Sequence, residues 1–193
     1  MKLDLLKGRK LVLASKSPRR SDLLGRANIP FEIRTQNVEE SYPADMSKIE
    51  VAEFLAIKKS NGCLSLLQDD ELLLTADSTV VLNNELYEKP VDLADAFRIV
   101  KALAGSKHQV ATGVCIRDKV KLVSFTEITD VYLDPMTDEE IDFYVNNYEV
   151  LDKAGSYAIQ DWIGTSKINR IDGSYTNVMG LPMARVYREL LGF

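Results

Sequence analysis

The sequence predicts an α/β protein with a mixed central sheet and flanking helices, and three observations support this prediction. Of the 193 residues, 46% are hydrophobic and 27% are charged, which is the balance of a folded globular chain. Short apolar runs rich in Leu and Val alternate with segments that carry helix-start signals through most of the chain. No internal repeat or low-complexity linker interrupts this alternation. We therefore expect residues 1–193 to form a single structural domain, with enough chain for two lobes.

The N-terminal part is expected to hold a short strand that leads directly into a helix. Residues 10–14 are an apolar run typical of a buried strand. Ser17 is a favourable N-cap and Pro18 suits the first helical position, so we expect a helix from there to about Ala27. An alternating strand over residues 31–35 follows.

A second helix is predicted from a capping box. Ser47 and Glu50 have the spacing at which each side chain accepts a hydrogen bond from the other's backbone amide. Apolar residues follow at helical spacing, so we expect this helix to run to about Leu67.

A central strand is expected over residues 71–76, with Asp77 at its end. The chain should continue in extended form over residues 79–82. Asn83-Asn84 is typical of a tight turn, which leads into a short strand at residues 85–87.

The second half of the chain continues the alternation. Asp92 is an N-cap for a helix over residues 93–103, and Thr137 with Glu140 forms a second capping box for a helix to about Asn147. The other expected elements are strands at 110–117, 120–129, 157–159 and 167–171 and a last helix at 181–190.

The composition argues against several classes of protein. The longest apolar stretches are far too short to span a bilayer, and the N-terminal segment lacks the continuous apolar core of a leader peptide. We expect a cytoplasmic protein with no membrane contact. The net charge is −5 and no Lys/Arg block is present, which argues against a broad nucleic-acid-binding face.

The cysteine and histidine content argues against disulfides and zinc. Cys63 and Cys115 lie far apart and form no CxxC pair. His108 is the only histidine, and a zinc enzyme usually needs several. We expect His108 to be an ordinary residue at the edge of a strand.

Hydroxyl and guanidinium groups gather at the first strand-to-helix junction, at Ser15, Ser17, Arg19 and Arg20. The free amides and the dipole at a helix start favour an anion, and these side chains would add directional donors to phosphate oxygens. The same residues are equally typical of an ordinary capped helix with two solvated arginines.

A carboxylate follows the central strand, and a lysine comes one short hairpin later. Asp77 could bind Mg²⁺ together with substrate phosphates, or accept a proton from water that attacks a phosphoanhydride. Lys89, before Pro90, could neutralise phosphate charge. Taken alone, Asp77 is also typical of a turn and Lys89 of a protein surface.

Residues 152–160 read DKAGSYAIQ and form the third polar segment. Gly155 permits close backbone approach, and the amide of Gln160 could read the edge of a base. Locally, a glycine turn into a strand is the preferred interpretation. Trp162, just beyond, could stack on a base, although packing against its neighbours is the preferred interpretation of a lone tryptophan.

Two charged pairs are lesser candidates. Glu39-Glu40 could supply a second carboxylate for a metal, although a charged pair in a loop is usually solvated. Lys58-Lys59 lies on a predicted helix, where solvation is also the usual outcome for lysine.

The polar segments occur in the order of the motifs of the Maf family. They read SxSPRR, then AD followed by a hydroxyl residue, then EKP, DKAGSYxIQ and GSYxNVMGLP. Each motif is weak alone, whereas the complete ordered set is specific. The chain resembles a Maf-type nucleotide pyrophosphatase from about Leu11 to Leu191.

The resemblance implies a fold similar to that of the inosine-triphosphate pyrophosphatases, with two lobes around a cleft. It also implies hydrolysis of a nucleoside triphosphate between its α and β phosphates, which serves to clean nucleotide pools. The reaction would depend on a divalent metal cation, Mg²⁺ or Mn²⁺. The resemblance further suggests a homodimer.

Roles follow from the resemblance together with the three polar segments. The catalytic proton acceptor falls on Asp77, which with Glu40 would also bind the metal. The expected substrate-binding residues are Ser15, Ser17, Arg19, Arg20, Lys59, Ser78, Lys89 and Gln160.

The choice of base stays open at Ser78. One branch of the family has Asp-Thr at this place and resembles dTTP/UTP pyrophosphatases, while another has Asp-Gln and acts on 7-methyl-GTP. Asp77-Ser78 is nearer the first, because serine keeps the hydroxyl. The alternatives are a pyrophosphatase for 7-methyl-GTP or modified nucleotides, and a nucleotide-binding regulator of septum formation, a process with which Maf proteins have been linked.

Overall fold

The computed structural model describes residues 5–193, and the chain divides into two compact units. Of the described residues, 5–77, 112–127 and 180–193 form unit 1, and 78–111 and 128–179 form unit 2. The long strands β3 (Glu71–Leu82), β5 (Lys107–Arg117) and β6 (Leu122–Leu133) each contribute residues to both units.

The strands form a mixed sheet in the order β2-β1-β3-β5-β6-β7, with β4 paired to β3 off this path. The short strands are β1 (Lys10–Leu13), β2 (Phe31–Ile33), β4 (Glu85–Tyr87) and β7 (Ile168–Asp172). β1 is parallel to β2 and β3, whereas β4 is antiparallel to β3 and β7 is antiparallel to β6. The predicted α/β class with a mixed sheet is confirmed.

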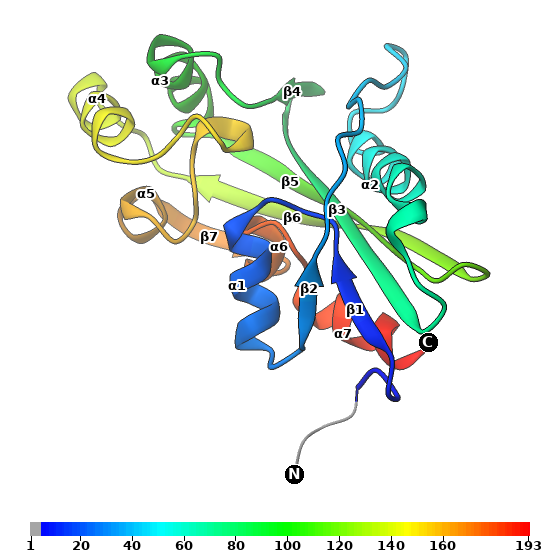
Figure 1. Ribbon diagram of the computed structural model, residues 1–193. Coiled ribbons are helices and arrows are strands. Elements are labelled where there is room, and N and C mark those ends of the chain that lie inside the picture. The colour runs from blue at the N-terminus through cyan, green and yellow to red at the C-terminus, as the bar shows by residue number, and fades with distance from the viewer. Residues whose placement is uncertain (1–4) are drawn as a thin grey trace. The chain divides into compact units, whose positions relative to one another are not determined.

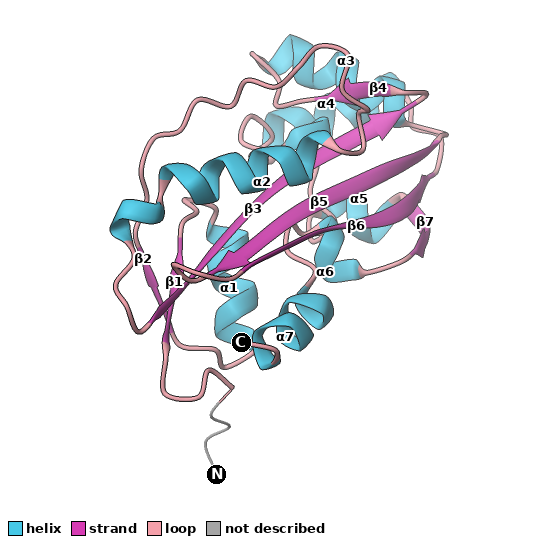
Figure 2. Ribbon diagram, turned by 90° about the vertical axis from the view of Figure 1, so that its right-hand side faces the viewer, coloured by secondary structure: helices cyan, strands magenta, loops and turns pink. Residues whose placement is uncertain are grey.

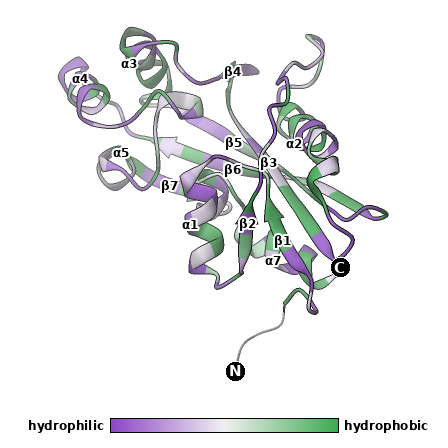
Figure 3. Cartoon of the chain, viewed as in Figure 1, coloured by the Kyte–Doolittle hydropathy of each residue, from purple (hydrophilic) through white to green (hydrophobic). Residues whose placement is uncertain are grey.

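In unit 1, helices cover both faces of the parallel strands. Leu72, Leu73 and Leu74 follow one another in β3, and all three side chains are fully buried. Successive strand residues point to opposite faces, so both faces must be covered. α2 (Val51–Gly62) lies on one face, and α1 (Pro18–Arg26) and α7 (Met183–Leu191) lie on the other (Figure 1, Figure 2). Figure 3 shows the hydrophobic residues concentrated along β1 and β3.

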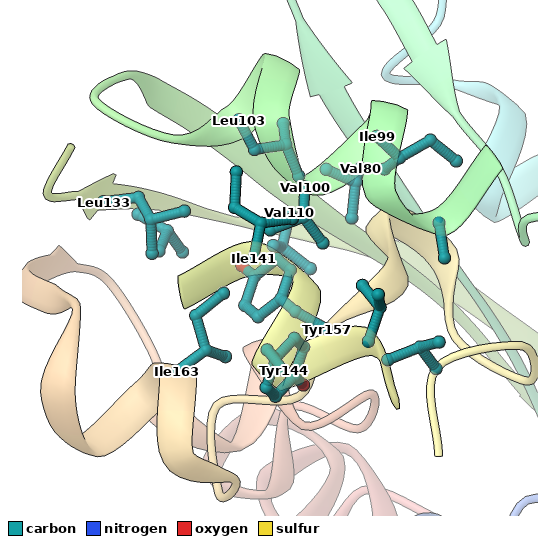
Figure 4. Close-up of a cluster of buried hydrophobic side chains, with 14 residues drawn as sticks. Val80, Ile99, Val100, Leu103, Val110, Leu133, Ile141, Tyr144, Tyr157 and Ile163 are labelled. Atoms are coloured by element: carbon teal, nitrogen blue, oxygen red, sulfur yellow. The ribbon is translucent and has the colours of Figure 1, made fainter. Parts of the chain in front are cut away.

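Unit 2 has a hydrophobic core of its own, shown in Figure 4. α3 (Leu93–Leu103) and α4 (Asp138–Asn147) supply much of it, including the buried Ile141 and Tyr144. The shorter elements of this unit are η2 (Ala154–Ser156), α5 (Trp162–Ser166) and α6 (Tyr175–Val178).

Most of the predicted elements are confirmed to within a few residues. Asp92 caps α3 by accepting from the amide of Asp95, and the capping box of Thr137 and Glu140 is formed at α4. The predicted tight turn between β3 and β4 has positive φ at both of its asparagines, 52° and 64°, as a type I′ hairpin requires. α5 and α6 had no counterpart among the predicted elements.

The capping box predicted at Ser47 and Glu50 is wrong. The amide of Glu50 bonds to the carbonyl oxygen of Ser47, 2.9 Å away, so these residues form a turn, and the helix begins one residue later, at Val51. α2 ends at Gly62 and not near Leu67, and a short 3₁₀ helix, η1 (Leu64–Leu66), follows.

The strand predicted at residues 157–159 is also wrong. The segment is buried, but the amide of Ala158 donates to the hydroxyl of Tyr144, 3.1 Å away, and not to a neighbouring strand. A side chain from α4 thus satisfies a backbone group that a strand would pair in a ladder.

The remaining predictions concern packing. Cys63 and Cys115 are free thiols, and both are buried. His108 lies in β5 with 1% of its surface exposed, and Trp162 packs edge-on against Phe143, as expected of a lone tryptophan. Within residues 5–193, no helix has the length and apolar character needed to cross a bilayer.

Candidate active site

The junction between β1 and α1 folds into a compact donor cluster within unit 1. The buried Ser15 follows β1 after Ala14, and its hydroxyl oxygen accepts from the amide of Ser17, 3.2 Å away. Pro18 begins α1 as predicted, although the side chain of Ser17 makes no cap hydrogen bond. The hydroxyl of Ser17 therefore does not occupy the amides at this helix start, where the dipole favours an anion.

Arg20 ties this junction to two distant segments of unit 1. Its guanidinium donates to the hydroxyl of Ser15 at 3.1 Å and to the carbonyl oxygens of Ala76 at 2.8 Å and Gly180 at 2.9 Å. The planar fork of an arginine can satisfy several acceptors at fixed angles. Arg20 consequently holds the backbone immediately before Asp77 against the start of α1.

Asp77 does not end a strand, which corrects the sequence-based prediction. β3 continues through Asp77 and Ser78 to Leu82 as one strand of 12 residues. The pattern misled because aspartate is disfavoured in strands, whereas here β1 pairs with the first part of β3 and β4 with its last part. The Asp77 side chain is only 14% exposed, so its carboxylate is well shielded from water.

Lys59 lies between two carboxylates of unit 1. Its ammonium is 2.5 Å from Oδ1 of Asp77 and 3.0 Å from Oε1 of Glu40. The Lys59 side chain is 18% exposed and comes from α2, while Glu40 is 54% exposed and comes from the loop after β2. Three of the predicted site residues are therefore brought together, although they lie on three separate segments.

The charges of this cluster act on Arg20. The pKa of the Arg20 guanidinium lies below its ordinary value. Loss of hydration is the largest cause and Arg19 acts in the same direction, whereas Asp77 and Glu40 oppose the shift. Arg19 is half-buried at the same helix start. Unit 1 thus gathers cations and carboxylates around one helix start, which suits a phosphorylated ligand together with a positively charged partner.

The donor set of unit 1 can be tested against a divalent cation. Among residues 5–193 no group of three or more His, Cys, Asp or Glu side chains is placed to hold a metal ion. Mg²⁺ is usually held in phosphate-handling sites by one or two carboxylates plus substrate phosphates. Asp77 and Glu40, which already share one cation in Lys59, fit that requirement.

The other predicted site residues belong to unit 2. Ser78 is half-buried in β3, whereas Lys89 and Gln160 are exposed. The amide of Gly155 donates to the carbonyl oxygen of Glu88, 3.3 Å away. This bond joins the DKAGSYAIQ segment to the EKP segment, so the second and third polar segments meet within unit 2.

Backbone conformation and close packing explain why residue 155 is a glycine. Its φ is +71°, and a Cβ built there would lie 2.8 Å from Cγ2 of Val80. A side chain would therefore both strain the backbone and collide with β3. This glycine permits the close approach that the sequence suggested.

The GSYTN segment, residues 173–177, holds α6 against the strands of unit 2 through hydrogen bonds. The buried amide of Asn177 donates to the carbonyl oxygen of Val110 at 3.0 Å and to the hydroxyl of Thr129 at 2.9 Å. The backbone amide of Ser174 also donates to the hydroxyl of Thr129, 3.0 Å away. These contacts fasten α6 to β5 and β6.

Two contacts of the site were not foreseen in the sequence. Gly180, in the GLP part of the last motif, presents its carbonyl oxygen to Arg20 across 160 positions of sequence. Lys59 pairs directly with Asp77 across 18 positions. The GLP sequence of the last motif was the only signal for the first contact, and the second had none beyond the resemblance.

With this geometry in place, comparison with protein families identifies the chain. A model of Maf-like proteins matches residues 10–193. The chain belongs to the Maf family. The resemblance inferred from the ordered motifs is confirmed.

Relatives within the Maf family match nearly the full length. A dTTP/UTP pyrophosphatase of Porphyromonas gingivalis is 43% identical over 99% of this chain and 98% of the relative. A dTTP/UTP pyrophosphatase of Flavobacterium johnsoniae is 40% identical over 97% of this chain and 96% of the relative.

Two solved structures match part of the chain. The Ham1 protein of Staphylococcus aureus matches 65% of this chain and 72% of its own, with a TM-score of 0.47 and 16% identity. A nucleoside-triphosphatase (dITP/XTP pyrophosphatase) of Mycobacterium abscessus matches 64% of this chain and 72% of its own, with a TM-score of 0.39 and 12% identity.

Proposed function

We propose that this Maf protein hydrolyses dTTP and UTP to the nucleoside monophosphate and pyrophosphate. The observation that carries the proposal is the shielded carboxylate of Asp77, held by Lys59 and lying directly after the backbone that Arg20 fixes to the start of α1. Relatives that are 40% and 43% identical over nearly the whole chain are dTTP/UTP pyrophosphatases.

The triphosphate binds at the start of α1. The helix amides, the hydroxyls of Ser15 and Ser17 and the guanidiniums of Arg19 and Arg20 supply donors to its phosphate oxygens. Lys59 adds a positive charge close to Asp77. Charges that are held in place before the reaction stabilise the charge that develops on the leaving pyrophosphate.

Asp77 accepts the proton in the chemical step. A water molecule attacks the α-phosphorus, its proton passes to a carboxylate oxygen of Asp77, and the bond from the α-phosphorus to the bridging oxygen breaks. Pyrophosphate takes the electron pair of that bond and leaves.

Asp77 and Glu40 are the residues that would hold a divalent cation, Mg²⁺ or Mn²⁺. When bound, the cation supplies Lewis-acid stabilisation of phosphate oxygens. The protein's part is to keep both carboxylates within reach of one position.

Residues of unit 2 are proposed to recognise the substrate. Gln160 presents an amide with both a donor and an acceptor, which suits the edge of a pyrimidine. Ser78, next to Asp77, carries a hydroxyl group like the threonine of the Asp-Thr branch. The exposed Lys89 supplies a positive charge that neutralises phosphate charge. The protein acts as a homodimer in the cytoplasm, where it removes triphosphates from the free nucleotide pool.

A substrate panel tests the proposal. Pyrophosphate release is measured with dTTP, UTP, CTP and 7-methyl-GTP, with Mg²⁺ and Mn²⁺ in turn. We expect dTTP and UTP to be the best substrates and the second product to be the monophosphate. Preference for 7-methyl-GTP would move the protein to the other branch of the family, and nucleotide binding without any turnover would indicate a regulator.

A further inference from the structure

The ammonium of Lys59 lies between Asp77 and Glu40, where a bound metal ion would also lie. A single ammonium lies within hydrogen-bond distance of an oxygen of each carboxylate. The Asp77 and Lys59 side chains are 14% and 18% exposed, so their contact is partly shielded from water. Mg²⁺ or Mn²⁺, which prefer carboxylate oxygens, would be held by the same two side chains.

An ammonium and a divalent cation cannot share this position. Both would contact the same carboxylate oxygens, and the repulsion between their charges is strong at so short a distance. Lysine has a long flexible side chain, so Lys59 can swing away while α2 stays in place. Arg20, by contrast, is fixed by three hydrogen bonds and cannot exchange in this way.

We propose that Lys59 is an internal cation that holds Asp77 and Glu40 together until a divalent cation displaces it, and that the displaced ammonium then binds the triphosphate. This inference rests on the proposed function, because it assigns the metal to these two carboxylates. Lys59 thereby couples the two binding events: the metal frees the lysine, and the phosphates receive it.

The test is a titration of Mn²⁺ without nucleotide, in which free Mn²⁺ is measured by electron paramagnetic resonance. Lys59→Met removes the competing charge at similar length, so we expect it to bind Mn²⁺ about tenfold more tightly than the unchanged protein, which corresponds to about 1.4 kcal/mol. Asp77→Asn should abolish this binding.

The matched control is Lys58→Met. Lys58 is the neighbouring lysine of α2, and its ammonium donates to the carbonyl and hydroxyl oxygens of Ser41, both 2.8 Å away. This variant changes the net charge equally but leaves the Asp77–Glu40 pair alone, so its Mn²⁺ affinity should equal that of the unchanged protein.

A second measurement uses the unchanged protein, in case Lys59→Met does not fold. Acetylation by a dilute amine reagent is followed at each lysine by mass spectrometry. Mn²⁺ should increase the rate at Lys59, which it releases, and leave the rate at Lys58 unchanged. This expectation holds without nucleotide.

Three results would overturn the inference. They are an equal or weaker Mn²⁺ affinity in folded Lys59→Met, the absence of Mn²⁺ binding in all variants, and a Lys59 acetylation rate that Mn²⁺ does not raise. Pyrophosphate release from dTTP by the unchanged protein is assayed separately. Its absence would contradict the proposed function, whereas release combined with any of the three results above would refute only the role of Lys59.

Discussion

The guanidinium of Arg20 donates a hydrogen bond to the carbonyl oxygen of Ala76, 2.8 Å away. Ala76 directly precedes Asp77 in β3, so a residue of the first motif fixes the backbone that carries the proposed proton acceptor. The same guanidinium reaches the carbonyl oxygen of Gly180 in the last motif. Motifs from both ends of the chain are thus joined by one side chain.

Replacing Arg20 with lysine should weaken both stability and activity. One ammonium keeps the charge but cannot reach all the acceptors that the guanidinium fork satisfies. We expect the free energy of unfolding in urea to fall by about 2 kcal/mol, the scale of a lost hydrogen bond from a charged group. Activity should fall too, because the backbone before Asp77 loosens.

Arg26→Lys is the control for Arg20→Lys. Arg26 ends α1 and pairs with Asp22 at the surface, with 66% of its side chain exposed. This substitution should stay within about 0.5 kcal/mol of the unchanged protein. If Arg20→Lys and Arg26→Lys unfold at the same urea concentration, the anchoring role of Arg20 is wrong.

Gly113 and Gly25 should respond to alanine in opposite directions. A Cβ at Gly113 would lie 2.2 Å from the backbone of Ala52 and Glu53, so the methyl group must push α2 away from β5. We expect Gly113→Ala to lose about 1–3 kcal/mol of stability. A Cβ at Gly25, inside α1, meets nothing within 4 Å, so Gly25→Ala should gain about 0.5–1 kcal/mol.

The same pair of variants reports on the active site. α2 carries Lys59, so displacing this helix in Gly113→Ala should also reduce pyrophosphate release, whereas Gly25→Ala should keep it. Urea unfolding and the pyrophosphate assay together check both expectations. Equal stability of the two variants would show that α2 does not rest on Gly113.

Acid should destabilise the protein through His108. Burial lowers the pKa of His108 from 6.5 to about 4, although Asp130 opposes this shift. Its Nε2 lies 2.7 Å from the hydroxyl of the buried Tyr157. Between these two pH values the unfolded chain binds a proton that the folded chain does not, so stability falls as the pH falls from about 6.5 to about 4.

The loss of unfolding free energy caused by His108 has an upper limit of about 1.4 kcal/mol per pH unit, because only one proton is bound. His108→Gln keeps a hydrogen-bonding side chain but cannot titrate. His108 is the only histidine, so the difference in pH dependence between the two proteins isolates it. Parallel unfolding curves over this pH range would contradict the assignment.

Local sequence signals predicted elements well where the local contacts decide the structure. Thr137 and Glu140 form the predicted capping box because their own side chains and amides complete it. Ser47 and Glu50 have the same spacing, yet they form a turn. The same spacing thus gives different local structures at the two places, so the spacing alone does not decide whether a capping box forms.

The site likewise combines residues that the sequence pointed to with long-range contacts that it did not predict. The ordered motifs contain Arg20 and Asp77, and the resemblance adds Lys59. In the structure Lys59 pairs with Asp77, and Arg20 bonds to the carbonyl oxygen of Ala76 next to it. The continuation of β3 through Asp77 depends on pairing with separate strands, and the bond from Arg20 to Gly180 spans 160 positions. No local rule of composition or spacing contains such contacts.

Pyrophosphate release by Asp77→Asn tests the role of Asp77 most directly. The amide keeps the size of the side chain but cannot accept the proton, so release from dTTP and UTP should fall at least about a hundredfold. Asp22→Asn, at the exposed salt bridge of α1, serves as the control and should keep full activity. Near-complete activity in a folded Asp77→Asn protein would contradict the assignment of Asp77 as the proton acceptor.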